Sequence, residues 1–120
     1  MEFQGDFLAG DCIFCKLVSG EIPTAKVYED DSVLAFQDRN PVAPTHVLVI
    51  PKKHIDGLAS SSETDRELLG SIQLAIRKIA ADAGLADYRV VSNNGRGAGQ
   101  SVFHLHYHLL SGRRMSWPPG

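Results

Sequence analysis

The segment "SVFHLHYHLL", residues 101–110, carries three of the chain's five histidines at two-residue spacing. Because successive side chains of a β-strand point to opposite faces, a strand here places His104, His106 and His108 on one face. The apolar residues then line the other face: Phe103, Leu105, Tyr107 and Leu109. A helix would turn His106 away from the other two histidines, so the alternation predicts a strand.

Three imidazoles on one sheet face need a purpose, since each buried ring requires hydrogen-bond partners away from water. They could be ordinary histidines at a strand edge, an interpretation that this desolvation cost disfavours. They could bind a metal ion, because a His-x-His pair can chelate zinc. They could also be catalytic, with one imidazole attacking phosphorus and a neighbour handling protons near neutral pH.

The preceding loop "NNGRGAGQS", residues 93–101, favours the catalytic hypothesis. Its glycines allow backbone N–H groups to approach an anion closely, and Asn93 and Ser101 add polar side chains. A plain glycine-rich connection between two strands is the ordinary alternative. Next to three aligned histidines, the loop predicts a phosphate cradle beside a nucleophile.

The rest of the chain predicts a single α+β domain over residues 10–120, after a loose tail at 1–9. A helical turn is expected at 11–23, capped by Asp11, and a long helix at 64–83, with Thr64 and Glu67 at capping-box spacing. Strand-like segments occupy residues 25–30, 32–38, 45–54, 88–93 and 102–112. Together they predict an antiparallel sheet with the long helix covering one face.

The composition excludes several classes of function. With 43% hydrophobic and 22% charged residues and a net charge of −2, the composition is that of a soluble globular protein, with no electrostatic reason to bind nucleic acid. No apolar run is long enough for a membrane span, and "MEFQGDFLAG" lacks the pattern of a secretion signal, so a cytoplasmic location is expected. Cys12 and Cys15 form a C-x-x-C motif, which in a reducing compartment indicates metal or redox chemistry.

Several segments together resemble the histidine-triad nucleotide-binding branch of the histidine triad (HIT) superfamily. They are "IFCKLVSGEIP", "PTHVLVIPKKHI", "GAGQS", "HLHYHLL" and "SGRRMSWPPG", and the resemblance covers nearly all of residues 11–120. It implies a five-stranded antiparallel sheet with one long helix and a short N-terminal helix, in a homodimer with a continuous ten-stranded sheet. It also implies that the tail at 112–120 reaches toward the partner's site, with Trp117 as an intersubunit contact, whereas an exposed aromatic in a frayed end is the alternative.

The resemblance implies a purine nucleoside phosphoramidase. His106 would attack the α-phosphorus of a substrate such as adenosine 5′-phosphoramidate, giving a nucleotidyl-histidine that water hydrolyses. His108 and the Ser101 hydroxyl would contact the phosphate and the leaving amine, while His104 and His46 would support the triad. No metal is needed for this step.

The same resemblance implies a nucleotide pocket for an AMP- or GMP-like ligand. Its base would lie between Ile13, Phe14 and Phe36, and Asp38 would accept from the ribose hydroxyls. Asn93 and the backbone amides around Gly99 and Gln100 would contact the phosphate. Core packing is the alternative role for the two phenylalanines, and a turn for Asp38.

A structural zinc site is implied at Cys12, Cys15, His54 and His104, since some members of the superfamily hold zinc with such a set. Reduced, unligated cysteines are the alternative. Three further hypotheses remain open for function: a dinucleoside polyphosphate hydrolase, a nucleotide-binding scaffold with incidental hydrolysis, and a pure zinc-binding module.

Overall fold

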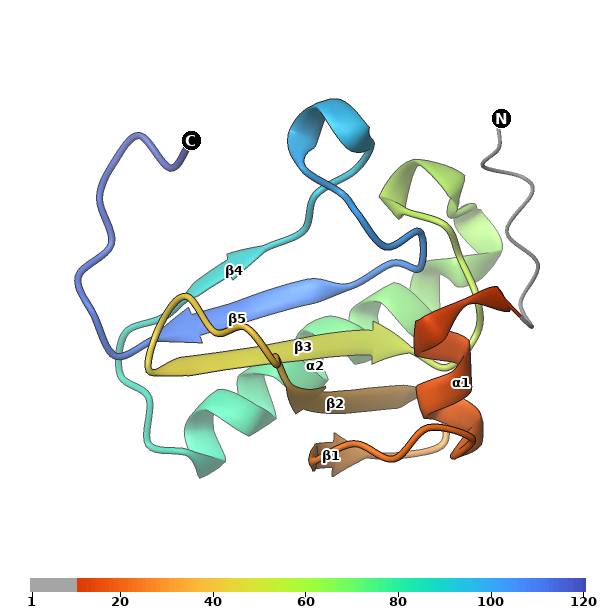
Figure 1. Ribbon diagram of the computed structural model, residues 1–120, viewed down its shortest axis with the longest axis horizontal. Helices are drawn as coiled ribbons and strands as arrows, with labels where there is room; N and C mark the ends of the chain where they lie inside the picture. Colours follow the sequence, from red (N-terminus) through yellow and green to blue (C-terminus); the bar gives the residue numbers. More distant parts are fainter. Residues whose placement is uncertain (1–10) are drawn as a thin grey trace.

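The computed structural model describes residues 11–120 and shows one antiparallel sheet of five strands in the order β1-β2-β3-β5-β4 (Figure 1). The predicted tail at 1–9 lies outside the described residues. A short helix precedes the sheet and a long helix connects β3 to β4. In chain order the elements are α1 (Ile13–Ser19), β1 (Lys26–Glu29), β2 (Val33–Gln37), β3 (Thr45–Pro51), α2 (Arg66–Asp82), β4 (Arg89–Val91) and β5 (Tyr107–Ser111). The predicted α+β class is confirmed.

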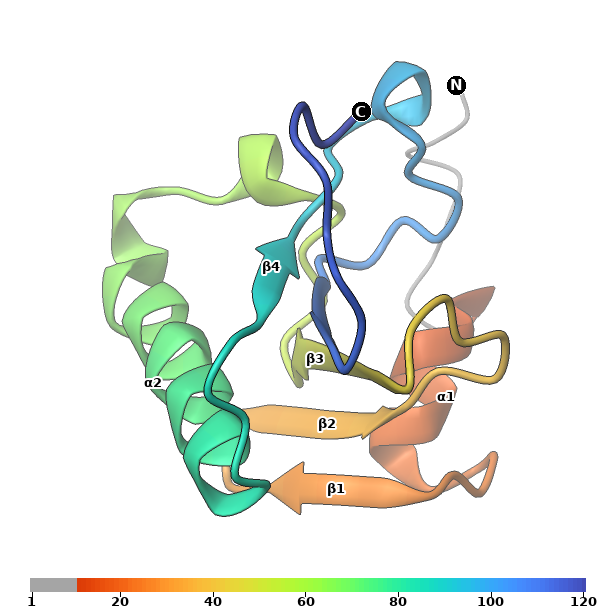
Figure 2. The same ribbon diagram turned by 90° about the vertical axis from the view of Figure 1, so that its left-hand side faces the viewer.

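The two faces of the sheet have different covers. Helix α2 packs along one face, as Figure 2 shows edge-on, and its Ile72, Ile76 and Ile79 enter a core with Val49 and Leu109 of the sheet. Helix α1 covers part of the opposite face, where Phe14 and Leu17 pack with Phe36, Leu48 and other buried apolar side chains. The histidines lie on this second, partly open face, so the sheet separates them from the main core.

Strand β5 is shorter than the sequence predicts, because it begins at Tyr107 rather than at residue 102. Of the three histidines in residues 101–110, only His108 lies in the ladder, opposite Leu48 of β3 and Val91 of β4. Before the strand, the Leu105 amide donates to the carbonyl of Ile55, outside β3, at 2.6 Å. The predicted strand is therefore wrong for His104 and His106, although Leu105 is still buried on the α2 side.

Both predicted helix starts also need correction. Cys12, not Asp11, caps α1, with its Sγ accepting from the Cys15 amide at 3.4 Å. Before α2, the capping box joins Ser62 and Asp65 and encloses a short 3₁₀ turn, whereas Thr64–Glu67 was predicted. The carboxylate of Asp65 also accepts from Lys53 Nζ at 2.6 Å, and this ion pair favours Asp65 as the capping partner.

No helix in the part of the chain from residue 11 onward combines the length and apolar character needed to cross a membrane.

Candidate active site and metal site

Four side chains meet where the end of β3, the N-terminus of α1 and the segment before β5 converge: Cys12, Cys15, His54 and His104. Their possible ligand atoms all lie within 4.8 Å of one another, and we call this group the Cys₂His₂ cluster. The Nδ1 atom of His104 lies 3.3 Å from the Sγ of Cys12 and 3.5 Å from that of Cys15, and His54 Nδ1 lies 3.2 Å from the Cys15 Sγ.

The cluster fits a tetrahedral zinc ion. Zinc with bonds of about 2.3 Å to sulfur and about 2.0 Å to nitrogen separates its ligand atoms by roughly 3.5 Å. The outward nitrogens are also anchored: His54 Nε2 donates to Asp56 Oδ1 at 2.7 Å and His104 Nε2 to the Pro51 carbonyl at 2.8 Å. These bonds leave both Nδ1 lone pairs facing the sulfurs, as a metal requires. Without a cation, burial raises the pKa of Cys15 to about 12, so a bound cation is needed to stabilise its thiolate.

His106 is fixed in one tautomer. Its Nδ1 lies 2.7 Å from the backbone carbonyl of His104, which can only accept, so the proton is on Nδ1 and Nε2 carries a lone pair. The ring is 7% exposed and meets the Phe14 ring edge-on at 5.3 Å between centroids. Burial lowers the pKa of His106, which keeps the ring neutral and nucleophilic at neutral pH.

A hydrogen-bonded chain connects His46 to His108. The Val42 amide donates to His46 Nδ1 at 3.1 Å, so the His46 proton is on Nε2. That nitrogen lies 2.9 Å from His108 Nδ1 and 3.3 Å from Asp38 Oδ2, which makes His108 Nδ1 an acceptor and places its proton on Nε2. Burial, followed by the neighbouring His106 and His46, lowers the pKa of His108 to about 4. His108 is thus a neutral hydrogen-bond donor.

Asp38, His46 and His108 lie close enough to suggest a second metal site. The tautomer of His46 argues against it, since binding through Nε2 would move a proton to Nδ1, directly against the Val42 amide. The group is better described as a chain of hydrogen bonds that orients His108. The predicted supporting role of His46 has a geometric basis here.

A cavity of about 300 Å³ adjoins the histidines through Phe14, which packs on His106, and Asp38, which contacts His46. The predicted ligand residues His106 and His108 are not among its lining residues. It is lined by five of the predicted ligand residues, Ile13, Phe14, Phe36, Asp38 and Ser101. The two phenylalanines also pack on each other, edge to face at 5.5 Å, so their core and pocket roles coincide. Asp38 likewise has a turn role, because its Oδ1 accepts from the Asn40 amide at 2.7 Å.

Other residues of the cavity lining were not predicted: Leu17, Ile22, Pro23, Thr24, Gln37, Arg39, Asn40, Leu48 and Val102. One of them carried a signal in the sequence. Leu17 lies one helical turn after Ile13. Leu48 lies opposite Phe36 across β2 and β3, a register that only the structure shows. Gln37 ends β2, and the others come from loops whose approach depends on tertiary structure.

The glycine loop, residues 93–101, is more closed than predicted. Gly95 and Gly99 adopt positive φ angles of 94° and 96°, which favour glycine. The amides of Gly99 and Gln100 donate inside the loop, to the carbonyls of Arg96 and Gly95, so they are not the open phosphate donors that were predicted. Ser101, exposed and lining the cavity, has no hydrogen bond within the described residues, so its hydroxyl is open to a ligand.

Asn93 and Ser92 follow β4 directly. The side-chain Nδ2 of Asn93 is 3.8 Å from where a Cβ on Gly99 would lie. The contact of Asn93 with phosphate stays a prediction. Ser92, which was not predicted, donates from Oγ to the His106 carbonyl at 2.8 Å. His106 is therefore held through its ring by His104 and through its backbone by Ser92.

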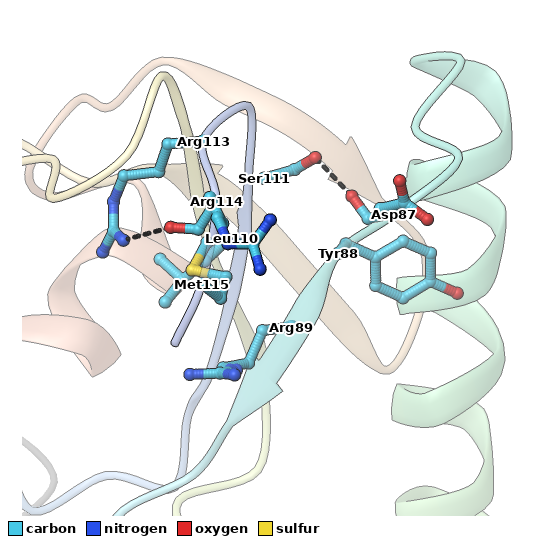
Figure 3. A pocket seen from close by; sticks show the side chains of 8 residues that line it. All are labelled: Asp87, Tyr88, Arg89, Leu110, Ser111, Arg113, Arg114 and Met115. Atoms are coloured by element: carbon cyan, nitrogen blue, oxygen red, sulfur yellow. Dashed lines mark hydrogen bonds between the residues drawn. The ribbon is translucent and has the colours of Figure 1, made fainter. Parts of the chain in front are cut away.

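The C-terminal tail starts at a second cavity of about 400 Å³, which Figure 3 shows between the start of β4 and the residues after β5. Arg89 Nη2 donates to the Ser116 carbonyl at 2.9 Å, and Arg113 Nε donates to the Val42 carbonyl at 2.8 Å. Trp117 is 81% exposed and lines neither cavity. The structure does not bring it to the site of its own chain, and its intersubunit role stays a prediction.

Comparisons with known proteins agree with this architecture. A family model described as HIT domain matches residues 19–115. An uncharacterized HIT-like protein of Synechocystis is 54% identical over 114 residues, covering 94% of this chain and 100% of the relative. A 14 kDa zinc-binding protein of Zea mays is 51% identical over 111 residues, covering 90% and 87%.

Among solved structures, a HIT family hydrolase from Legionella pneumophila superposes with a TM-score of 0.88 at 50% identity, covering 91% of this chain and 99% of that chain. The residues that the family model matches include all five strands and the histidine segment. This chain belongs to the HIT domain family.

Proposed function

We propose that the chain is a purine nucleoside phosphoramidase of the histidine-triad nucleotide-binding type. The observation that carries this proposal is the fixed tautomer of His106, whose Nδ1 is hydrogen-bonded to the His104 carbonyl and whose Nε2 is free of a proton. That lone pair attacks the α-phosphorus. A P–Nε2 bond forms, the P–N bond to the amine breaks, and the nucleotide is left on His106.

The departing amine needs a proton, and the developing phosphoryl charge needs hydrogen bonds. The Nε2–H of the neutral His108 and the hydroxyl of Ser101 supply the hydrogen bonds, and the departing amine takes its proton from solvent water. His46 and Asp38 keep the His108 ring oriented while it remains neutral. Water then attacks the nucleotidyl-histidine and releases the nucleoside monophosphate.

The nucleoside is proposed to occupy the 300 Å³ cavity. The purine would lie against Ile13, Phe14 and Phe36. Each oxygen of Asp38 has one protein contact, and a carboxylate oxygen has lone pairs for another, so Asp38 can still accept from a ribose hydroxyl.

The Cys₂His₂ cluster is proposed to hold a structural zinc ion, which would cross-link α1 to the segment before β5. The relative from Zea mays carries the name zinc-binding protein, and the donor set of this chain fits the ion. Both cysteines are free thiols in the structure, which also favours the predicted cytoplasmic location.

A homodimer is proposed through β4, an edge strand of the sheet. Tyr88, Val90 and Leu74 present exposed apolar side chains at this strand and on α2. Pairing two β4 edges would extend the sheets into one of ten strands and would cover these side chains. Trp117 could then reach the partner's cavity.

The decisive experiment compares wild-type protein with His106→Ala on adenosine 5′-phosphoramidate and on a dinucleoside tetraphosphate. We expect the wild type to favour the phosphoramidate, with a nucleotidyl adduct detectable by mass spectrometry after acid quenching. His106→Ala should lose both turnover and adduct. Turnover by His106→Ala at the wild-type rate would rule out the mechanism, and preference for the tetraphosphate would assign the chain to dinucleoside polyphosphate hydrolysis.

A further inference from the structure

Asp56 contacts the Cys₂His₂ cluster and the glycine loop at the same time. Its carboxylate Oδ1 accepts from His54 Nε2 at 2.7 Å, which orients one proposed zinc ligand. Its backbone carbonyl accepts from Gln100 Nε2, also at 2.7 Å. A single residue thus forms bonds in two directions, one toward the metal ligands and one toward the loop.

Gln100 uses every hydrogen-bonding atom of its side chain. Nε2 donates to the carbonyls of Asp56 and Val102, at 2.7 and 3.1 Å, and Oε1 accepts from the Gly95 amide at 2.8 Å. The side chain is 5% exposed, so it is a buried clamp. It joins the glycine loop at Gly95 and the segment that leaves the loop at Val102 to the same point beside the metal ligands.

A side chain on residue 57 would collide with this clamp. A Cβ on Gly57 would lie 2.7 Å from Asn94 Oδ1 and 3.3 Å from Gln100 Oε1. The backbone of Gly57 is extended, with φ at −169°, so space and not conformation calls for glycine there. Asn94 makes a separate connection, because its Oδ1 accepts from the Ala59 amide at 2.8 Å and does not reach the metal ligands.

We propose that Asp56 and Gln100 are positioning residues that transmit occupancy of the metal site to the glycine loop. An ion in the Cys₂His₂ cluster fixes His54, His54 fixes Asp56, and Asp56 fixes the clamp that shapes the loop beside Ser101. This coupling rests on the proposed function for its catalytic meaning. It gives the metal a second structural effect besides the orientation of His104.

The test measures amide hydrogen exchange of residues 95–101 in the full chain, with zinc bound and after removal by a chelator. In the wild type we expect exchange to be about tenfold slower with zinc bound, because removal of zinc releases the hydrogen bonds of the clamp. Gln100→Glu keeps the size of the side chain but turns an oxygen toward two carbonyls. It should still bind zinc, while its loop exchange no longer responds.

The matched control is Asn94→Ala, which frees the same loop from Ala59. It should raise exchange of the loop with and without zinc and keep the response to the metal. A wild-type response in Gln100→Glu, or a wild type whose loop ignores zinc or that binds no zinc, would overturn the proposal.

Asp56→Asn provides a second route if Gln100→Glu does not fold. It should lower zinc affinity by about 10–100-fold, measured by chelator competition, and abolish the response of the loop at saturating zinc. Wild-type affinity with an intact response would contradict the coupling. Because neither measurement uses substrate, an inactive chain with intact coupling counts against the phosphoramidase proposal only, and an active chain without coupling counts against this inference only.

Discussion

Gly112 follows β5 and lies against Pro44, and its replacement by alanine should destabilise the fold. Its φ is +99°, and an added Cβ would lie 2.8 Å from Pro44 Cβ and 3.0 Å from Pro44 Cγ. The backbone strain costs about 1–2 kcal/mol and the overpacking about 1–3 kcal/mol. Gly112→Ala should therefore lower the free energy of unfolding by about 2–5 kcal/mol.

Gly84→Ala is the matched control. Gly84 also has a positive φ, +70°, but nothing lies within 4 Å of the added Cβ, so only the strain of about 1–2 kcal/mol applies. For a chain of this size each kcal/mol lowers Tm by roughly 3–6 °C. Thermal unfolding followed by circular dichroism should separate the two variants, with Gly112→Ala melting lower. Equal Tm values would refute the steric part of the reasoning.

The same substitution should reach the active site. Pro44 lies in the connection that carries Val42, whose amide fixes the tautomer of His46. Displacing this connection should reduce kcat/KM for a phosphoramidate at a temperature where both variants are folded, while Gly84→Ala retains the wild-type value. An unchanged kcat/KM in folded Gly112→Ala would mean that the chain from Val42 to His108 tolerates the shift.

Three further outcomes follow from the site. Burial lowers the pKa of His106 and lowers that of His108 to about 4, so kcat/KM should be level near neutrality and fall only below pH 6.5. In the metal-free protein, His108 contributes about 1–2 kcal/mol to the free energy of unfolding, after allowance for its partial exposure. This contribution should be lost between pH 6.5 and 4, because the unfolded state takes up the proton first. A rise of activity on acidification would contradict the neutral nucleophile. Ser92→Ala should lower stability by about 1 kcal/mol and reduce kcat more than it changes KM, whereas Ser61→Ala, which loses an exposed turn bond, should leave kcat unchanged. Chelation should lower the Tm of the wild type but not of Cys15→Ser, as differential scanning calorimetry can show.

The sequence predicted the sheet and the face of the histidines because both follow from local alternation. It could not predict that His104 and His106 leave the strand. The bonds responsible join Leu105 to Ile55 and Ser92 to His106, and the partners are distant in the chain. Register and loop approach, which decide such bonds, are tertiary properties.

The site shows the same division. The resemblance to the family identified the proposed zinc ligands and the aromatic walls of the cavity, and their side-chain types suit those roles. The bond from the Val42 amide to His46 could not be predicted from side-chain type, since every residue except proline has a backbone amide. The resemblance assigned the Gln100 backbone amide to the phosphate, but that amide donates to the Gly95 carbonyl, and the side chain bonds backbone groups of Gly95 and Asp56.

The opposed tautomers of His106 and His108 have a consequence for inhibitor design. One ring offers a lone pair and its neighbour offers a proton, so the pair distinguishes the two ends of a bound group. A compound with a donor toward His106 and an acceptor toward His108 would match both rings, whereas sulfate dianion, which carries no proton and accepts on every side at neutral pH, would meet a repulsive lone pair at His106. Selective ligands for this pocket should therefore be polar in one direction, not merely anionic.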